Sequence, residues 1–130
     1  MFFRFGAAQK TVLLIDDDHS LRRQMLVRLE RVDKVQVLQA EDGSGGLQRA
    51  QQDLPDLVVL DWMLPDIPGT MVLERLKRSE KTRNIPVLMV TGRNKLGDID
   101  DAFALGADAY LTKPFSLQKL GEKVSKMLGD

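Results

Sequence analysis

The sequence predicts an α/β fold: a single doubly wound sheet of five parallel strands with five helices. Apolar runs alternate with stretches of helical periodicity along the chain, five of each. Three of the runs are apolar without interruption, which is typical of parallel strands buried on both faces. Right-handed crossovers between such strands lead to a doubly wound sheet.

Short apolar runs mark the expected strands, and helical periodicity marks the helices that follow them. The strands are expected at residues 12–15, 35–38, 57–60, 86–90 and 109–112, and the helices at 20–32, 44–52, 70–80, 98–105 and 116–128. The first and third helices should turn inward the side chains of Leu21, Met25, Leu29, Val32, Val72, Leu73 and Leu76. Gly106 suits a left-handed cap after the fourth helix, and Ser116 suits the N-cap of the fifth.

Composition is that of an ordinary folded domain. The 130 residues suit one domain, with residues 1–9 as an N-terminal tail and 10–129 as the folded part. The absence of cysteine and the single histidine, His19, exclude disulfides, thiolate zinc sites and multi-histidine metal sites. The 19 basic and 19 acidic residues balance, so we expect no direct binding to nucleic acid or a membrane. Without a signal peptide, a cytoplasmic location is expected.

Chemically active side chains follow four of the five expected strands. Asp16, Asp17 and Asp18 come after the first, Asp61 after the third, Thr91 after the fourth and Lys113 after the fifth. Taken singly, these residues suit helix caps, turns or a surface lysine. Parallel strands end at one edge of the sheet, where open α/β folds bind ligands, so we expect the set to form one site.

Clustered carboxylates favour a cation. Two unit charges about 4 Å apart repel by about 4 kcal/mol at an effective dielectric near 20. Oxygen ligands without histidine or cysteine select Mg²⁺ or Mn²⁺ rather than Zn²⁺. A carboxylate beside such an ion can act as a nucleophile, with Lys113 and Thr91 stabilising charge on phosphoryl oxygens. The predicted reaction is phosphoryl transfer onto Asp61.

Four motifs carry a resemblance to a known family. They are Leu13-Leu14-Ile15-Asp16-Asp17-Asp18, Leu60-Asp61-Trp62-Met63-Leu64-Pro65, Val90-Thr91-Gly92 and Lys113-Pro114-Phe115. In order and spacing they resemble the receiver domain of two-component response regulators, the chemotaxis receiver included. The resemblance covers about residues 10–129 and implies a flavodoxin-like sheet with strand order 2-1-3-4-5.

The resemblance implies a role for each motif residue. Asp61 would accept the phosphoryl group, and Thr91 and Lys113 would contact its oxygens. Mg²⁺, for which Mn²⁺ can substitute, would be held by Asp16, Asp17, Asp61 and the backbone carbonyl of Met63. Tyr110 would act as an aromatic switch with Thr91, the Lys113–Pro114 bond would be cis, and Met63 and Arg93 would occupy the positions that tune phosphoryl lifetime.

The resemblance also implies partners. The donor would be a histidine kinase or a histidine phosphotransfer protein, and the output an unknown protein or domain, read out around Ile99, Phe103, Tyr110 and Leu117. Beyond catalysing its own phosphorylation and dephosphorylation the chain would not be an enzyme. A phosphorylation-dependent dimer is left open, because Ala109 and three lysines (119, 123 and 126) replace residues typical of one dimer-forming subfamily.

Two other functions fit the sequence less well. A phosphatase of the haloacid dehalogenase type needs a second acid two residues after the nucleophile, where this sequence has Met63. A pseudo-receiver would bind partners without phosphorylation, and the complete set of Asp17, Asp61, Thr91 and Lys113 argues against it. Neither a P-loop nor a G-x-G-x-x-G motif is present, so nucleotide binding is not expected.

Overall fold

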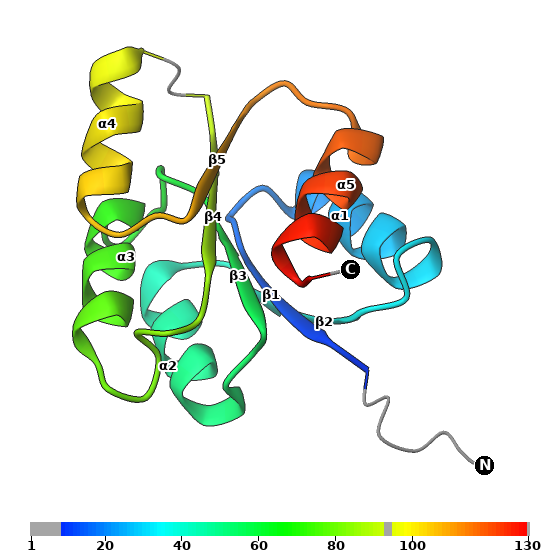
Figure 1. Cartoon of the computed structure of the whole chain (residues 1–130), viewed down its shortest axis with the longest axis horizontal. Coiled ribbons are helices and arrows are strands. Elements are labelled where there is room, and N and C mark those ends of the chain that lie inside the picture. The colour runs from blue at the N-terminus through cyan, green and yellow to red at the C-terminus, as the bar shows by residue number, and fades with distance from the viewer. Residues whose placement is uncertain (1–8, 93–94, 130) are drawn as a thin grey trace.

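The central sheet has five parallel strands in the order β2-β1-β3-β4-β5 (Figure 1). A computed structural model describes residues 9–92 and 95–129. The strands are β1 (Thr11–Ile15), β2 (Gln36–Ala40), β3 (Leu57–Leu60), β4 (Val87–Thr91) and β5 (Ala109–Thr112). All four neighbouring pairs run parallel. The fold class and the strand order expected from the sequence are confirmed.

Five helices cover the two faces of this sheet (Figure 1). They are α1 (His19–Arg31), α2 (Gly43–Asp53), α3 (Gly69–Arg78), α4 (Leu96–Ala104) and α5 (Leu117–Met127). Buried residues of α1 and α5 share one apolar cluster with the sheet, and those of α2, α3 and α4 share the other. The helices therefore form an outer layer on each side, as a doubly wound sheet requires.

Alternate residues of the inner strands face opposite layers. In β1, Val12 and Leu14 join the cluster under α1 and α5, whereas Leu13 and Ile15 join the cluster under α2, α3 and α4. All four side chains are completely buried. Full burial of one such side chain contributes about 1.5–3 kcal/mol, so uninterrupted apolar strands stabilise both layers at once.

Helix ends follow the expected chemistry with small shifts. The side chains of Asp18, Asp42 and Ser116 accept hydrogen bonds from backbone N–H groups in the first turns of α1, α2 and α5. Gly106, with φ of 113°, adopts the left-handed region after α4 that was expected of it. Helix α4 begins at Leu96 rather than at residue 98.

Two expectations from periodicity were wrong. Val32 does not belong to the inward face of α1: it is the C-cap residue and is 57% exposed, because the helix ends before it. The second strand lies one residue later than expected and extends to Ala40, since its backbone register with β1 runs from Gln36 to Ala40.

One further expectation concerns the N-terminal end of the chain. Residues 1–8 of the expected tail lie outside the described residues. Within the described ranges, no helix is both long and apolar enough to span a membrane.

Candidate functional site

The chemically active side chains expected at the strand ends meet at one edge of the sheet. Asp16 follows β1, Asp61 follows β3, and Lys113 follows β5. The Lys113 ammonium lies 3.2 Å from Asp16 Oδ2 and 3.1 Å from Asp61 Oδ2. A single cation thus bridges carboxylates that are 45 residues apart in the sequence, which a random scatter of surface charges would not produce.

Three carboxylates form a compact oxygen cluster at this edge. Asp16, Asp17 and Asp61 each present one carboxylate oxygen, and these oxygens lie within 4.8 Å of one another. Asp16 is 2% exposed and Asp61 is 6% exposed, whereas Asp17 is open to solvent. This donor set fits Mg²⁺ or Mn²⁺, which prefer hard oxygen ligands and keep part of their coordination shell open to water or a phosphoryl group.

The electrostatics of the site show a surplus of negative charge. Burial is the main cause that raises the pKa of Asp61 above its usual range, and the neighbouring charge of Asp16 raises it further. Lys113 opposes this rise only in part. Burial lowers the pKa of Lys113, but attraction to Asp16 and Asp61 outweighs it, so the pKa of Lys113 is raised and the ammonium stays charged. A second cation would relieve the remaining repulsion.

The loop between β3 and α3 is built to keep Asp61 in place. The amide of Gly69 donates to the carbonyl of Trp62 at 2.7 Å. A Cβ atom at position 69 would overlap the backbone carbonyl of Asp61, so only glycine fits. The amide of Met63 donates to Asp61 Oδ1 at 3.4 Å, and the Met63 side chain is exposed beside the site. The metal-ligand role of the Met63 carbonyl remains a prediction.

Thr91 and Tyr110 lie on neighbouring strands and on the same face of the sheet. Thr91 is 1% exposed and pairs with Thr112. Tyr110 pairs with Met89, is half-buried, and packs against the apolar cluster under α2, α3 and α4. The role of these two residues as a switch remains a prediction.

Two further expectations concern the loops at this edge. The Lys113–Pro114 peptide bond is cis, as the resemblance implied. Arg93, expected to tune phosphoryl lifetime, lies outside the described residues.

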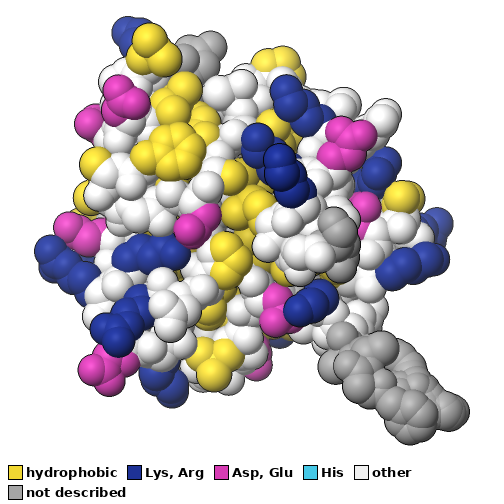
Figure 2. Space-filling view, viewed as in Figure 1, with side chains coloured by type: hydrophobic (Ala, Val, Ile, Leu, Met, Phe, Trp, Pro, Cys, Tyr) yellow, Lys and Arg dark blue, Asp and Glu magenta, His cyan; other side chains and the backbone are white. Residues whose placement is uncertain are grey.

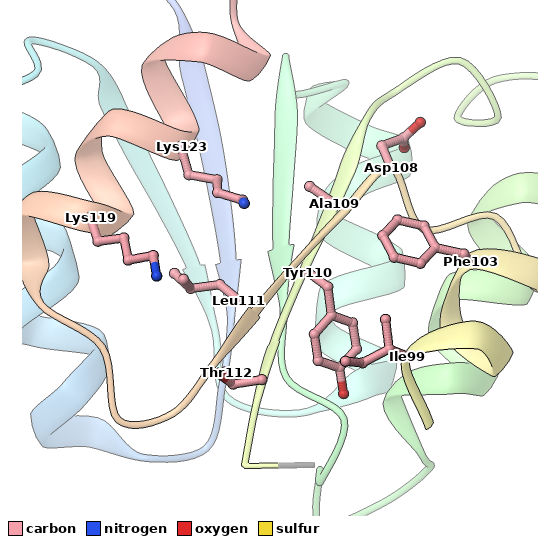
Figure 3. A pocket seen from close by; sticks show the side chains of 9 residues that line it. All are labelled: Ile99, Phe103, Asp108, Ala109, Tyr110, Leu111, Thr112, Lys119 and Lys123. Carbon is pink, nitrogen blue, oxygen red and sulfur yellow. The ribbon is translucent and has the colours of Figure 1, made fainter. Parts of the chain in front are cut away.

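A shallow pocket of about 460 Å³ lies between α4, β5 and α5 (Figure 3). Ile99, Phe103 and Tyr110 line its α4 side, and the ammonium groups of Lys119 and Lys123 reach in from α5. In the space-filling view, hydrophobic side chains gather over α4 and basic ones over α5 (Figure 2). Three of the four residues expected at the readout surface therefore line one pocket.

Leu117, the fourth residue expected at that surface, lies elsewhere. It lines a separate apolar pocket with residues of α1, among them Gln24 and Val27. The difference arises because Leu117 belongs to the first turn of α5, on the side of that helix that packs toward α1.

Two residues near the site were missed by the sequence interpretation. The Asp66 carboxylate accepts hydrogen bonds from the amides of Gly43 and Ser44, both at 2.8 Å, and so caps α2 from another loop. Nothing local in the sequence signals this contact. Arg22 is buried and donates to the carbonyl of Asp16 at 2.6 Å. Its spacing from Met25 and Leu29 places it on the apolar face of α1, which was an available signal.

Comparison with known proteins agrees with this geometry. The family model described as "Response regulator receiver domain" matches residues 12–125. The chain is 42% identical over 117 residues to the DNA-binding dual master transcriptional regulator RpaA of Synechocystis, covering 90% of this chain and 48% of that protein. It is 34% identical over 119 residues to the phosphate regulon transcriptional regulatory protein PhoB of Escherichia coli, covering 92% of this chain and 52% of that protein. The chain spans about half the length of these relatives.

Solved structures give the same answer for the fold and the family. A CheY-like response regulator receiver domain protein from Methanospirillum hungatei superposes with a TM-score of 0.86 at 30% identity, covering 93% of this chain and 94% of that one. A putative response regulator from Chloroflexus aurantiacus gives 0.87 at 31% identity, covering 94% and 99%. Since the family match spans most of the sequence, the chain belongs to the response regulator receiver domain family.

Proposed function

We propose that residues 10–129 form a phosphorelay receiver that takes a phosphoryl group from a phosphohistidine donor onto Asp61 with the help of Mg²⁺. One observation carries the proposal: the carboxylates of Asp16, Asp17 and Asp61 lie together beside the ammonium of Lys113. The receiver role itself follows from family membership. The metal and the residue roles are what the experiments below test.

In the proposed reaction a carboxylate oxygen of Asp61 attacks the phosphorus of the donor. The bond between phosphorus and the donor imidazole nitrogen breaks, and its electron pair returns to the imidazole as an acyl phosphate forms on Asp61. Lys113 already lies 3.1 Å from Asp61 Oδ2, within reach of a phosphoryl oxygen attached there. Thr91, at the end of β4, would donate to another of these oxygens.

Asp16, Asp17, Asp61 and the backbone carbonyl of Met63 would hold the Mg²⁺ ion, which Mn²⁺ can replace. When bound, the ion neutralises the charge that builds up on the transferring group. The chain's own contribution is to keep the carboxylates together against their repulsion. Burial of Asp16 and Asp61 in the sheet edge supplies that restraint.

A change of conformation would carry the signal. Phosphorylation adds charge and acceptor oxygens at the sheet edge. If Thr91 and Lys113 interact better with those oxygens in a second arrangement, the population shifts toward it, and Tyr110 moves with Thr91. The pocket lined by Ile99, Phe103 and Tyr110 would then change shape for an output protein or domain.

The remaining elements of the proposal are expectations from the sequence and from its resemblance to the family. A histidine kinase or a histidine phosphotransfer protein would supply the phosphoryl group, in the cytoplasm. The chain would catalyse only its own phosphorylation and dephosphorylation, would bind neither nucleic acid nor a membrane itself, and a phosphorylation-dependent dimer remains an alternative.

The proposal is tested by intact-mass spectrometry after incubation with acetyl phosphate and Mg²⁺. One phosphoryl group should be added to the unaltered chain, and Asp61→Asn or prior removal of Mg²⁺ with EDTA should abolish the addition. Asp100→Asn serves as the control, because Asp100 is an exposed acid on α4. A folded chain that takes up no phosphoryl group would favour the pseudo-receiver alternative.

A further inference from the structure

Arg22 is the one buried basic side chain among the described residues. The buried charged residues there are Asp16, Asp61 and Arg22, with Arg22 only 7% exposed. The first two belong to the candidate metal site. Arg22 lies in the first turns of α1 and contacts the backbone next to that site.

Among the described residues, the polar contacts of the Arg22 guanidinium include no carboxylate. Nη1 donates to the carbonyl of Asp16 at 2.6 Å, Nε donates to Gln39 Oε1 at 2.9 Å, and Nη2 lies 3.2 Å from His19 Nδ1. Within the described ranges, no carboxylate lies at ion-pair distance from the guanidinium. A buried cation without a paired anion is unfavourable unless its hydrogen bonds or the surrounding field compensate for it.

The shortest of these contacts fixes the backbone that carries the metal-site acids. The amide of Asp16 donates to the carbonyl of Ala40 at 3.2 Å, so Arg22 and strand β2 hold the two sides of this residue. Two residues further along the chain, the amide of Asp18 donates to Asp16 Oδ1 at 2.9 Å. Asp17 lies between these two fixed residues and is exposed, so its carboxylate direction depends on how the backbone is held.

We propose that Arg22 is a positioning residue for divalent-cation binding, acting through the backbone of Asp16 to aim the carboxylates of Asp16 and Asp17. This inference rests on the proposed function of the site. Groups that do not touch a metal ion but orient its ligands typically change the metal affinity by about 10- to 100-fold when they are removed. Arg22 differs from such partners in that it holds a main-chain carbonyl, and it brings a positive charge.

That positive charge makes the direction of the effect diagnostic. If Arg22 acted only through its charge, its removal would strengthen Mg²⁺ binding, because one cation repels another. If Arg22 acts by holding the backbone, its removal weakens binding. The two effects have opposite signs, so a measured affinity separates them.

The experiment is a Mg²⁺ titration of metal-free protein by isothermal calorimetry, with Trp62 emission as a second readout. Arg22→Gln keeps a polar side chain but loses the reach and the donors of guanidinium. We expect its dissociation constant for Mg²⁺ to be about tenfold weaker than that of the unaltered chain. Arg23→Gln is the matched control, since it removes an exposed arginine from the next position of α1. Its affinity should stay the same or rise slightly.

Arg22→Lys is a second variant, for which an intermediate Mg²⁺ affinity is expected. Its ammonium can reach the Asp16 carbonyl but cannot also keep the contacts with Gln39 and His19, so an affinity between those of the unaltered chain and Arg22→Gln is expected. Circular dichroism without metal verifies that each variant is folded. If Arg22→Gln does not fold, Arg22→Lys decides alone, and its affinity must be weaker than that of the unaltered chain.

The outcomes separate the two proposals. An unaltered chain that shows no Mg²⁺ response overturns both the proposed function and the role of Arg22. Normal binding by the unaltered chain, with equal or tighter binding by folded Arg22→Gln, overturns the role of Arg22 alone. Equal weakening in Arg22→Gln and Arg23→Gln also overturns it, because the effect would then not depend on the contact with Asp16.

Discussion

Replacing Asp61 with asparagine should make the metal-free protein more stable at neutral pH. The Asp61 carboxylate is 6% exposed, and its pKa is raised by burial and by the nearby charge of Asp16. A raised pKa means that the folded state disfavours the ionised form. Asparagine has nearly the same shape and carries no charge, so it removes that disadvantage.

The size of the expected gain in stability follows from opposing electrostatic contributions at Asp61. At the 4.8 Å limit of the oxygen cluster, Asp16 and Asp61 repel by about 3.5 kcal/mol at an effective dielectric near 20. At 3.1 Å, Lys113 attracts Asp61 by about 5 kcal/mol on the same scale. Burial of the carboxylate opposes folding by several kcal/mol. Because the pKa is raised, repulsion and burial together exceed the attraction, and a net gain on the order of 1 kcal/mol is expected for Asp61→Asn.

The stability that Asp61→Asn gains over the unaltered chain should increase with pH. Asp61 has a raised folded-state pKa, so the stability of the unaltered chain relative to the variant is greatest below the ordinary value of 3.8. That relative stability is lost as the pH rises through the folded-state pKa. The difference between the two proteins therefore grows upward from about pH 3.8 and then levels off above the folded-state pKa.

The assay is urea unfolding followed by far-ultraviolet circular dichroism, in EDTA and in excess Mg²⁺. In EDTA, Asp61→Asn should unfold at higher urea, whereas the control Asp100→Asn should not. In Mg²⁺ at about 100 times its dissociation constant, the unaltered chain should gain about 2.7 kcal/mol and the variant much less. A variant that is less stable in EDTA, or that keeps the full Mg²⁺ gain, would refute the electrostatic description of the site.

Three other substitutions test neighbouring contacts. Lys113→Met should destabilise the metal-free protein by about 2 kcal/mol, reduced from the value for a fully buried pair because Lys113 is partly exposed, and Mg²⁺ should restore much of the loss in urea unfolding. Gly69→Ala should lose several kcal/mol in the same assay, roughly 3, because its Cβ would overlap the carbonyl of Asp61, whereas Gly92→Ala has open space and should be tolerated. Asp66→Ala should lower the melting temperature at neutral pH. Since hydrogen bonds from two backbone amides hold the pKa of Asp66 well below its ordinary 3.8, that difference should shrink as the pH falls below 3.8, and a difference independent of pH would contradict the capping role.

The sequence was sufficient for the fold and the general location of the site because both depend on a repeated pattern. Uninterrupted apolar runs such as Leu57–Leu60 require burial on both faces, and a parallel sheet brings the ends of its strands to one edge. Asp16, Asp61 and Lys113 meet there as expected.

Tertiary contacts and the exact ends of helices were not predictable from the sequence in the same way. Asp66 caps α2 although 22 residues separate it from Ser44. Leu117 packs toward α1 rather than toward the α4 pocket, because only the packing of α5 decides which side of its first turn is covered. Val32 fits a helical repeat, but the helix ends one residue earlier. Periodicity describes one element at a time, so it reports neither contacts between elements nor the residue at which a helix ends.

The most direct measurement is a crystal structure of the protein with Mg²⁺ and beryllofluoride, a mimic of a phosphoryl group on a carboxylate. We predict beryllium bonded to an oxygen of Asp61, one Mg²⁺ ion held by Asp16, Asp17 and Asp61, and Lys113 in contact with a fluorine atom. Density for beryllofluoride on another carboxylate, or an Mg²⁺ ion bound away from these three acids in a folded protein, would contradict the proposed phosphoacceptor site.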